Sequence, residues 1–85
     1  MRRTKSIPKF VDLPFSYPRI KVKQWTKRRM EAYCEDTDGC WMVDDMTIYV
    51  CKSLPARRKR YVYAHELLHA VHDWMLWCHY EGVTD

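Results

Sequence analysis

Apolar and polar residues alternate with the period of a strand in the first half of the chain. Residues 19–23 alternate basic and apolar side chains, as a half-buried strand does. Four segments are predicted as strands on alternation or on their β-branched and aromatic content: 19–23, 31–34, 40–43 and 46–51. The second and third are joined by a turn that ends in Asp38-Gly39. Residues 25–30 fit either a turn or a short helix.

The second half of the chain carries a long helical pattern, from about residue 54 to residue 80, with Gly82 as its stop. One stripe of this helix is apolar and is expected to pack on the sheet: Ala64, Leu67, Leu68, Val71, Trp74, Met75 and Cys78. A second stripe contains Tyr61, His65, His69, His72, Leu76 and His79. A surface helix usually has charged residues on the face opposite its core stripe. The histidines found on this face therefore indicate a cleft.

These elements predict an α+β domain in which a small, mostly antiparallel sheet packs against one long helix. The 85 residues suffice for a single domain with one modest core. Residues 1–18 contain Pro8, Pro14 and Pro18 and are predicted as an extended arm, with the folded domain at 19–85. A straight helix over 54–80 would be about 40 Å long. A domain of this size is only about 30 Å across, which predicts a break after Asp73.

Charge is distributed unevenly along the chain. Residues 1–30 hold ten Lys and Arg against one acid, a balance of +9, whereas residues 31–56 hold one base against six acids, a balance of −5. A basic segment of this kind binds nucleic acid or an acidic protein surface, or is a solvated arm that neutralises the acidic stretch. The cluster Arg57–Arg60 is a further basic segment, and its place in the first helical turn opposes the helix dipole.

Hydropathy predicts a cytoplasmic protein, in the host cytoplasm if a phage encodes it. No apolar run reaches the length of a membrane span, and the basic N-terminus lacks the apolar stretch of a signal peptide. Four cysteines without a secretion signal are expected to be free, partly buried thiols. Cys34 and Cys40 flank the predicted turn and are the pair placed to face each other.

The segment with the most specific chemistry is His65-Glu66-Leu67-Leu68-His69, an HExxH sequence inside the helical pattern. Residues i and i+4 of a helix lie on one face, so His65 and His69 can bind one zinc ion. Glu66 lies beside them as a candidate general base that activates water for attack on a peptide carbonyl. Candidate donors for the oxyanion are Tyr61, His72 and Tyr80.

A catalytic zinc site needs a third protein ligand. His72 lies about 10 Å along the helix axis from His65, which is too far for both to bind one zinc ion. Asp73 is placed to orient the imidazole of His69 and not to bind the metal. His79 and Glu81 reach the metal only if the helix breaks after Asp73. His79 is the preferred third ligand, and Glu81 is the alternative.

Residues 39–72 resemble the core of small zincin metallopeptidases. Gly39, the strand-like Thr47-Ile48-Tyr49-Val50, the basic stretch 57–60 and the HExxH pentad follow in the order seen in ImmA/IrrE-like and SprT-like peptidases. The short HExxH proteins of bacteriophage genomes are particularly similar. The resemblance implies zinc on His65 and His69, Glu66 as base, and a strand at 46–51 that binds the substrate backbone along the cleft.

Two functions follow from these residues. The first is a zinc-dependent metallopeptidase acting on a protein or peptide. The second is a zincin-shaped binding module with weak or no catalysis, used by a phage or mobile element to engage a host protein or nucleic acid.

Overall fold

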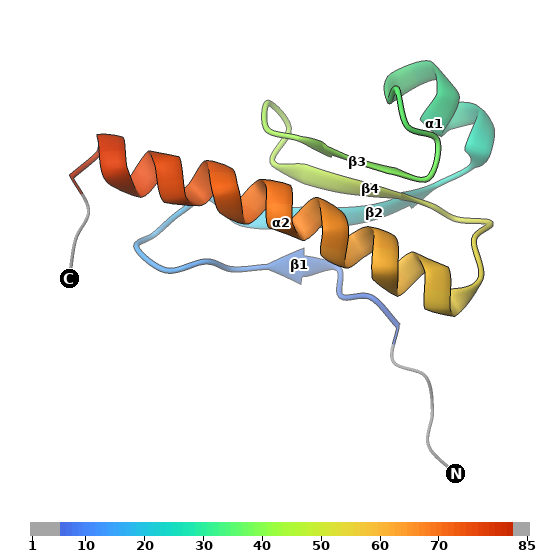
Figure 1. Ribbon diagram of the computed structural model, residues 1–85, viewed down its shortest axis with the longest axis horizontal. Coiled ribbons are helices and arrows are strands. Elements are labelled where there is room, and N and C mark those ends of the chain that lie inside the picture. The colour runs from blue at the N-terminus through green and yellow to red at the C-terminus, as the bar shows by residue number, and fades with distance from the viewer. Residues whose placement is uncertain (1–5, 83–85) are drawn as a thin grey trace, which may run out of the picture.

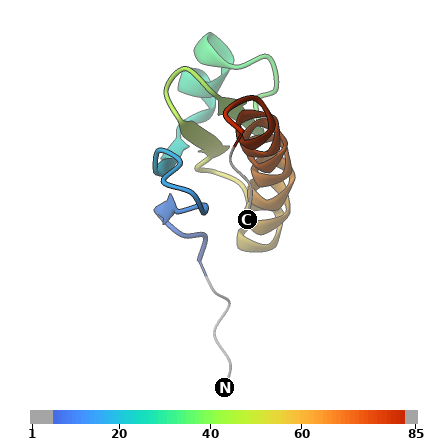
Figure 2. The ribbon, with the colours of Figure 1, turned by 90° about the vertical axis from the view of Figure 1, so that its left-hand side faces the viewer.

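Four strands form one sheet, and a long helix crosses one of its faces (Figure 1). A computed structural model of the chain describes residues 6–82. The elements are β1 (Phe10–Val11), β2 (Ile20–Trp25), α1 (Lys27–Tyr33), β3 (Gly39–Met42), β4 (Thr47–Cys51) and α2 (Ala56–Tyr80). The α+β class is therefore confirmed. Viewed from the end of α2, this helix lies on one side of the strands and α1 lies away from it (Figure 2).

The sheet is mixed rather than mostly antiparallel. Its strand order is β1-β2-β4-β3, in which β1 with β2 and β3 with β4 are antiparallel while the central pair β2 and β4 is parallel. Between β2 and β4 the chain crosses over through α1 and β3, which makes the parallel pairing possible. Strand β4 therefore lies inside the sheet, and β3 forms an outer edge.

The predicted strand at 31–34 is wrong, because this segment ends helix α1. Thr26 caps the helix, its hydroxyl accepting a hydrogen bond from the backbone N–H of Arg29 at 3.3 Å. Met30 is fully buried in a cluster with Cys34, Tyr49 and Cys51. The tertiary contact of Met30 and a good cap thus outweigh the strand-like composition of Tyr33-Cys34.

Strand β4 separates two small cores. Ile48 and Val50 face α2 and pack with Ile20 and Val22 of β2. Tyr49 and Cys51 point to the opposite face and pack under α1. All five residues of β4 are buried, as expected for a central strand covered on both sides.

Helix α2 is continuous, so the predicted break after Asp73 is wrong. Its 25 residues run to Tyr80, and Gly82 follows in a left-handed conformation (φ +67°) as the predicted stop. The helix needs no break because the molecule is flat, with extents of 40 × 38 × 15 Å that accommodate a straight helix. Within residues 6–82 no helix combines the length and apolar character needed to cross a membrane.

The face of α2 that packs on the sheet is turned by about a third of a helical turn from the predicted one. Val62, Glu66 and Ala70 are its buried residues. Of the predicted stripe, Leu67, Val71, Trp74 and Cys78 are half-buried, and three residues are exposed: Ala64, Leu68 and Met75. Strand β3 approaches this face closely at Gly39, where Val62 and Glu66 lie.

The predicted N-terminal arm packs on the domain from residue 6 onward, and residues 1–5 lie outside the described part. Phe10 and Val11 pair with β2, and the carbonyl of Pro14 accepts a hydrogen bond from Trp74 Nε1 at 3.1 Å. Tyr17 is buried with its ring 5.1 Å from that of Trp77. The arm thus contributes a strand and core contacts.

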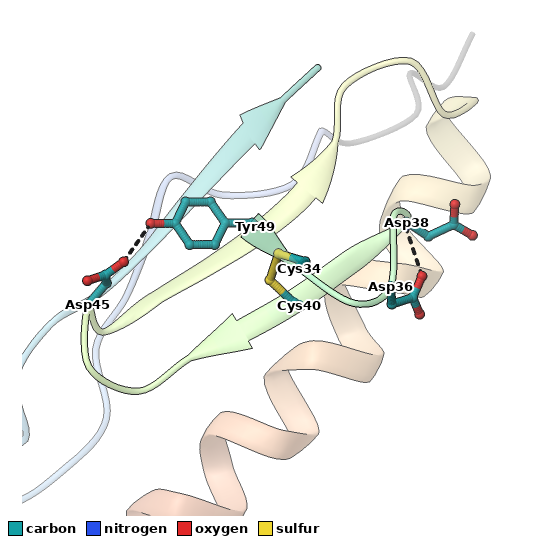
Figure 3. Close-up of a disulfide and its surroundings, with 6 residues drawn as sticks. All are labelled: Cys34, Asp36, Asp38, Cys40, Asp45 and Tyr49. Atoms are coloured by element: carbon teal, nitrogen blue, oxygen red, sulfur yellow. Dashed lines mark hydrogen bonds between the residues drawn. A yellow bond between two sulfur atoms is a disulfide. The ribbon is translucent and has the colours of Figure 1, made fainter. Parts of the chain in front are cut away.

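Cys34 and Cys40 form a disulfide, so the expectation of free thiols is wrong for this pair (Figure 3). The bond joins the end of α1 to β3 and closes the loop in which Asp36 accepts a hydrogen bond from the N–H of Asp38. Cys51 and Cys78 are free, as expected.

Reduction of the disulfide is expected to destabilise the domain. A bond between residues six positions apart restricts the unfolded chain by about 2 kcal/mol in the chain-entropy model. Urea denaturation with and without dithiothreitol measures this difference. The double variant Cys34→Ser/Cys40→Ser is the control, since dithiothreitol should not change its stability. An equal response of both proteins to the reductant would contradict the assignment.

Candidate metal centre

The two histidines of the HExxH pentad converge on α2. His65 Nε2 and His69 Nε2 are 3.3 Å apart, and the ring centroids are separated by 5.0 Å. Both residues are exposed at the rim of a cleft. One turn of helix between them holds both rings on the same side, as the sequence spacing predicts.

This separation fits zinc. Two nitrogens bound to one tetrahedral zinc at about 2.0–2.1 Å stand about 3.3 Å from each other. The same distance also suits a hydrogen bond between two neutral imidazoles, one donating and one accepting. The donor chemistry of the pair therefore fits two of the three protein ligands of a catalytic zinc site.

Glu66 is the buried acid of the site, with 7% of its surface exposed. It lines the cleft beside His65 and His69. Burial raises the pKa of the Glu66 carboxyl. The neighbouring imidazoles oppose this rise when they are charged, and the carboxylate of Asp36 adds to it. A carboxylate with little solvation and a raised pKa is a better proton acceptor than an exposed one.

A cleft of 530 Å³ lies between strand β3 and helix α2. The helix contributes His65, Glu66, His69, His72 and Asp73 to its lining. The facing wall comes from the end of α1, the disulfide and β3: Tyr33, Cys34, Glu35, Asp36, Gly39, Cys40, Trp41 and Met42. The predicted cleft therefore has carboxylates on both walls.

Gly39 sets the distance between the two walls at one end. A Cβ at this position would overlap Val62 Cγ1 and would lie 3.4 Å from Glu66 Cγ. Farther along β3, Trp41 Nε1 donates a hydrogen bond of 2.6 Å to Asp73 Oδ2. These two contacts hold β3 against the helix face on which Glu66 lies.

The third ligand predicted from the sequence does not join the histidine pair here. In the continuous helix His79 stands about 21 Å along the axis from His65, and Glu81 lies still farther away. Among residues 6–82, no group of three His, Cys, Asp or Glu side chains is arranged to hold a metal ion. His65 and His69 are brought together, and His79 is not brought to them.

The other predicted site residues lie as follows. His72 lines the main cleft, whereas Tyr61 lines a smaller adjoining cavity that also contains His65 and Glu66. Tyr80 is 81% exposed and is not part of either lining. Asp73 accepts its hydrogen bond from Trp41, so its predicted role of orienting His69 is replaced by a contact that connects α2 to β3.

The prediction that the strand at 46–51 binds the substrate backbone along the cleft is wrong. Residues 47–51 form β4, whose backbone is already paired on both sides with β2 and β3. Strand β3, which lines the cleft, is the outer strand on that side of the sheet. The sequence did not predict β3 as the cleft wall. Gly39, directly before an apolar segment, could have indicated it, because glycine in a strand often marks a close approach of another element or a ligand.

Comparisons with protein-family models, with curated proteins and with solved structures gave no match.

Replacing Gly39 by Ala is expected to cost about 1–3 kcal/mol of folding free energy, because the new methyl group overlaps Val62. Urea denaturation of Gly39→Ala, Val62→Ala and the double variant measures the coupling of the two positions. Gly39→Ala should cost less in the Val62→Ala background. An equal cost in both backgrounds would show that β3 does not approach α2 at this point.

Glu66→Gln is expected to stabilise the metal-free protein at neutral pH. The folded-state pKa of Glu66 is raised by burial, so the stability associated with its protonated form is present at low pH and is lost as the pH rises through that pKa. Glutamine does not ionise and so avoids this loss. The stability difference between Glu66→Gln and wild type should therefore vanish in acid, where Glu66 is protonated. Thermal unfolding in a chelator at several pH values measures it, with exposed Glu31→Gln as control. A stability difference between Glu66→Gln and wild type that does not change with pH would contradict a buried Glu66 with a raised pKa.

Proposed function

We propose that the protein is a zinc-dependent metallopeptidase-like domain that hydrolyses a peptide bond in the cleft between β3 and α2. The observation that carries the proposal is the 3.3 Å separation of His65 Nε2 and His69 Nε2 beside a buried Glu66. An isolated pair of surface histidines needs no buried carboxylate next to it. A metal-activated hydrolysis needs both.

His65 and His69 would hold the zinc ion. When bound, zinc supplies Lewis-acid polarisation of a carbonyl and lowers the pKa of bound water towards about 7. Glu66 would accept a proton from water in the cleft and donate it to the leaving amine. His72, on the same cleft wall, is the candidate donor for the developing oxyanion.

The substrate would bind as an extended peptide along β3. The outer backbone groups of this strand have no partner strand among residues 6–82, so they are free to pair with a peptide. Trp41 and Met42 lie at the far end of the same cleft wall, where side chains of such a peptide would pack.

A second function, a binding module of the same shape without catalysis, is favoured by one observation. The described residues provide two ligands for zinc, whereas hydrolytic zinc sites have three. In this alternative the cleft binds a protein segment, and Glu66 takes no part in chemistry.

Metal analysis of the purified protein after dialysis against zinc tests the site. Wild-type protein should retain stoichiometric zinc, and His65→Ala and His69→Ala should lose it. His79→Ala is the matched control and should retain it, because His79 lies about 21 Å away along the helix. Zinc-free wild-type protein would exclude the site. Loss of zinc in His79→Ala would show that the end of α2 reaches it.

Cleavage of a fluorogenic peptide library by the zinc-loaded protein separates the two functions. Glu66→Gln should lower the rate by about 10²–10⁴-fold, as expected for removal of a general base, while zinc content stays unchanged. Zinc binding without any cleavage, and with no difference between wild type and Glu66→Gln, would favour the binding module.

A further inference from the structure

A groove with a basic lining runs along the outer edge of β2, at the opposite end of the strand order from β3. Just before the short β1, the chain already lies beside β2, because Val22 N–H donates a hydrogen bond to the carbonyl of Lys9 at 2.9 Å. The groove has a volume of 450 Å³, and Lys9, Lys21 and Lys23 contribute to its lining. Among residues 6–82, no acidic side chain lines it.

A smaller cavity of 110 Å³ continues this groove towards α2. It shares Ser6, Ile7 and Gln24 with the groove and adds Lys59 and Arg60 from the first turns of the helix. The described residues of this lining also include no acid. We call the two cavities together the basic groove, with five cationic residues: Lys9, Lys21, Lys23, Lys59 and Arg60.

The charges of the basic groove are not balanced within the described part of the chain. The two ion pairs found among residues 6–82 are Asp12 with Arg19 and Asp38 with Arg58, and neither involves a groove cation. Arg60 Nη1 is buried and has no hydrogen-bond acceptor in the part of the chain that the structure describes. A buried donor without a partner is costly, so this guanidinium indicates a missing acceptor.

The start of α2 strengthens the preference of the basic groove for an anion. Pro55 occupies the N-cap position and provides no side-chain hydrogen bond to the first turn. The first turn contains no acidic residue, so the positive end of the helix dipole lies near Lys59 and Arg60 without a carboxylate from that turn. Cations at this end of a helix are unfavourable unless an anion binds among them.

An aromatic ring lies in the same lining. Phe10 is 51% exposed at the edge of the sheet, and its cross-strand partner is Lys21. The guanidinium of Arg19 lies 5.1 Å from the ring centroid. An exposed ring among cations is the arrangement on which unpaired bases stack while the phosphates bind nearby.

We propose that the basic groove binds single-stranded nucleic acid, with the groove cations on the phosphates and Phe10 against a base. The half-exposed Phe10 ring in the lining favours unpaired bases over a duplex, whose bases stack on one another, and over an acidic protein segment. This activity is independent of the zinc site, because the groove and the HExxH cleft lie at opposite edges of the sheet.

Fluorescence anisotropy of labelled oligothymidylate at several salt concentrations tests the proposal with the full chain. Lys21→Gln/Lys23→Gln should weaken binding and lower the slope of log affinity against log salt by about 1.4, since each phosphate contact on a single strand contributes about 0.7. Arg57→Gln/Arg58→Gln removes the same charge outside the basic groove and should leave the slope unchanged.

Phe10 provides a second, charge-independent test. Phe10→Ala should weaken oligothymidylate binding at least about fivefold, whereas Phe10→Tyr, which keeps the ring, should bind as wild type does. Both variants should bind a duplex of the same length equally, because paired bases do not stack on the ring.

Four results would overturn the proposal: no oligothymidylate binding by wild type, equal weakening by the two double-glutamine variants, duplex binding as tight as single-strand binding, or equal affinities of Phe10→Ala and Phe10→Tyr. Binding to phosphatidylserine vesicles or to polyglutamate in place of the oligonucleotide would assign the groove to a membrane or an acidic protein instead. Loss of zinc binding would affect none of these outcomes.

Discussion

The candidate site depends on the close approach of strand β3 to helix α2 at Gly39. Because this residue has no Cβ, the strand comes into contact with Val62 and with the stem of Glu66. The contact buries the carboxyl of Glu66 while His65 and His69 remain at the open rim. The hydrogen bond from Trp41 to Asp73 fixes the strand at the other end of the cleft. A larger residue at position 39 would separate the acid from the wall that buries it.

The two edges of one small sheet are available for different chemistry. At one edge, β3 has backbone groups that no strand among residues 6–82 pairs with, beside the histidine pair and the acidic walls of the cleft. At the other edge β2 is only partly covered by β1, and lysines line the groove that results. Helix α2 connects the two regions, because its first turns reach the basic groove and its middle turns carry the HExxH pentad. We infer that the uneven charge of the chain reflects this division.

Local patterns in the sequence predicted which segments form helices and strands better than they predicted how these elements pack. The α+β class, strand β3, strand β4, helix α2 and the Gly82 stop followed from periodicity and turn chemistry. For helix α1 the sequence left 25–30 open between a turn and a short helix and predicted a strand at 31–34, because the burial of Met30 is a long-range contact. The packed face of α2 was misplaced because Leu68 and Met75 are apolar yet exposed, while Glu66 is charged yet buried. The His65 and His69 pair was predictable from i, i+4 spacing, but the β3 wall depends on sheet order, which one sequence pattern does not encode.

X-ray absorption spectroscopy at the zinc edge tests the central claim most directly, because it reports the ligands of the bound ion without requiring a substrate. We expect two imidazole nitrogens at about 2.0–2.1 Å and further oxygen ligands, with the imidazole signal lost in His65→Ala. Sulfur at about 2.3 Å, from Cys51, Cys78 or a reduced Cys34–Cys40 pair, would place the ion elsewhere and contradict a zinc site on the HExxH helix.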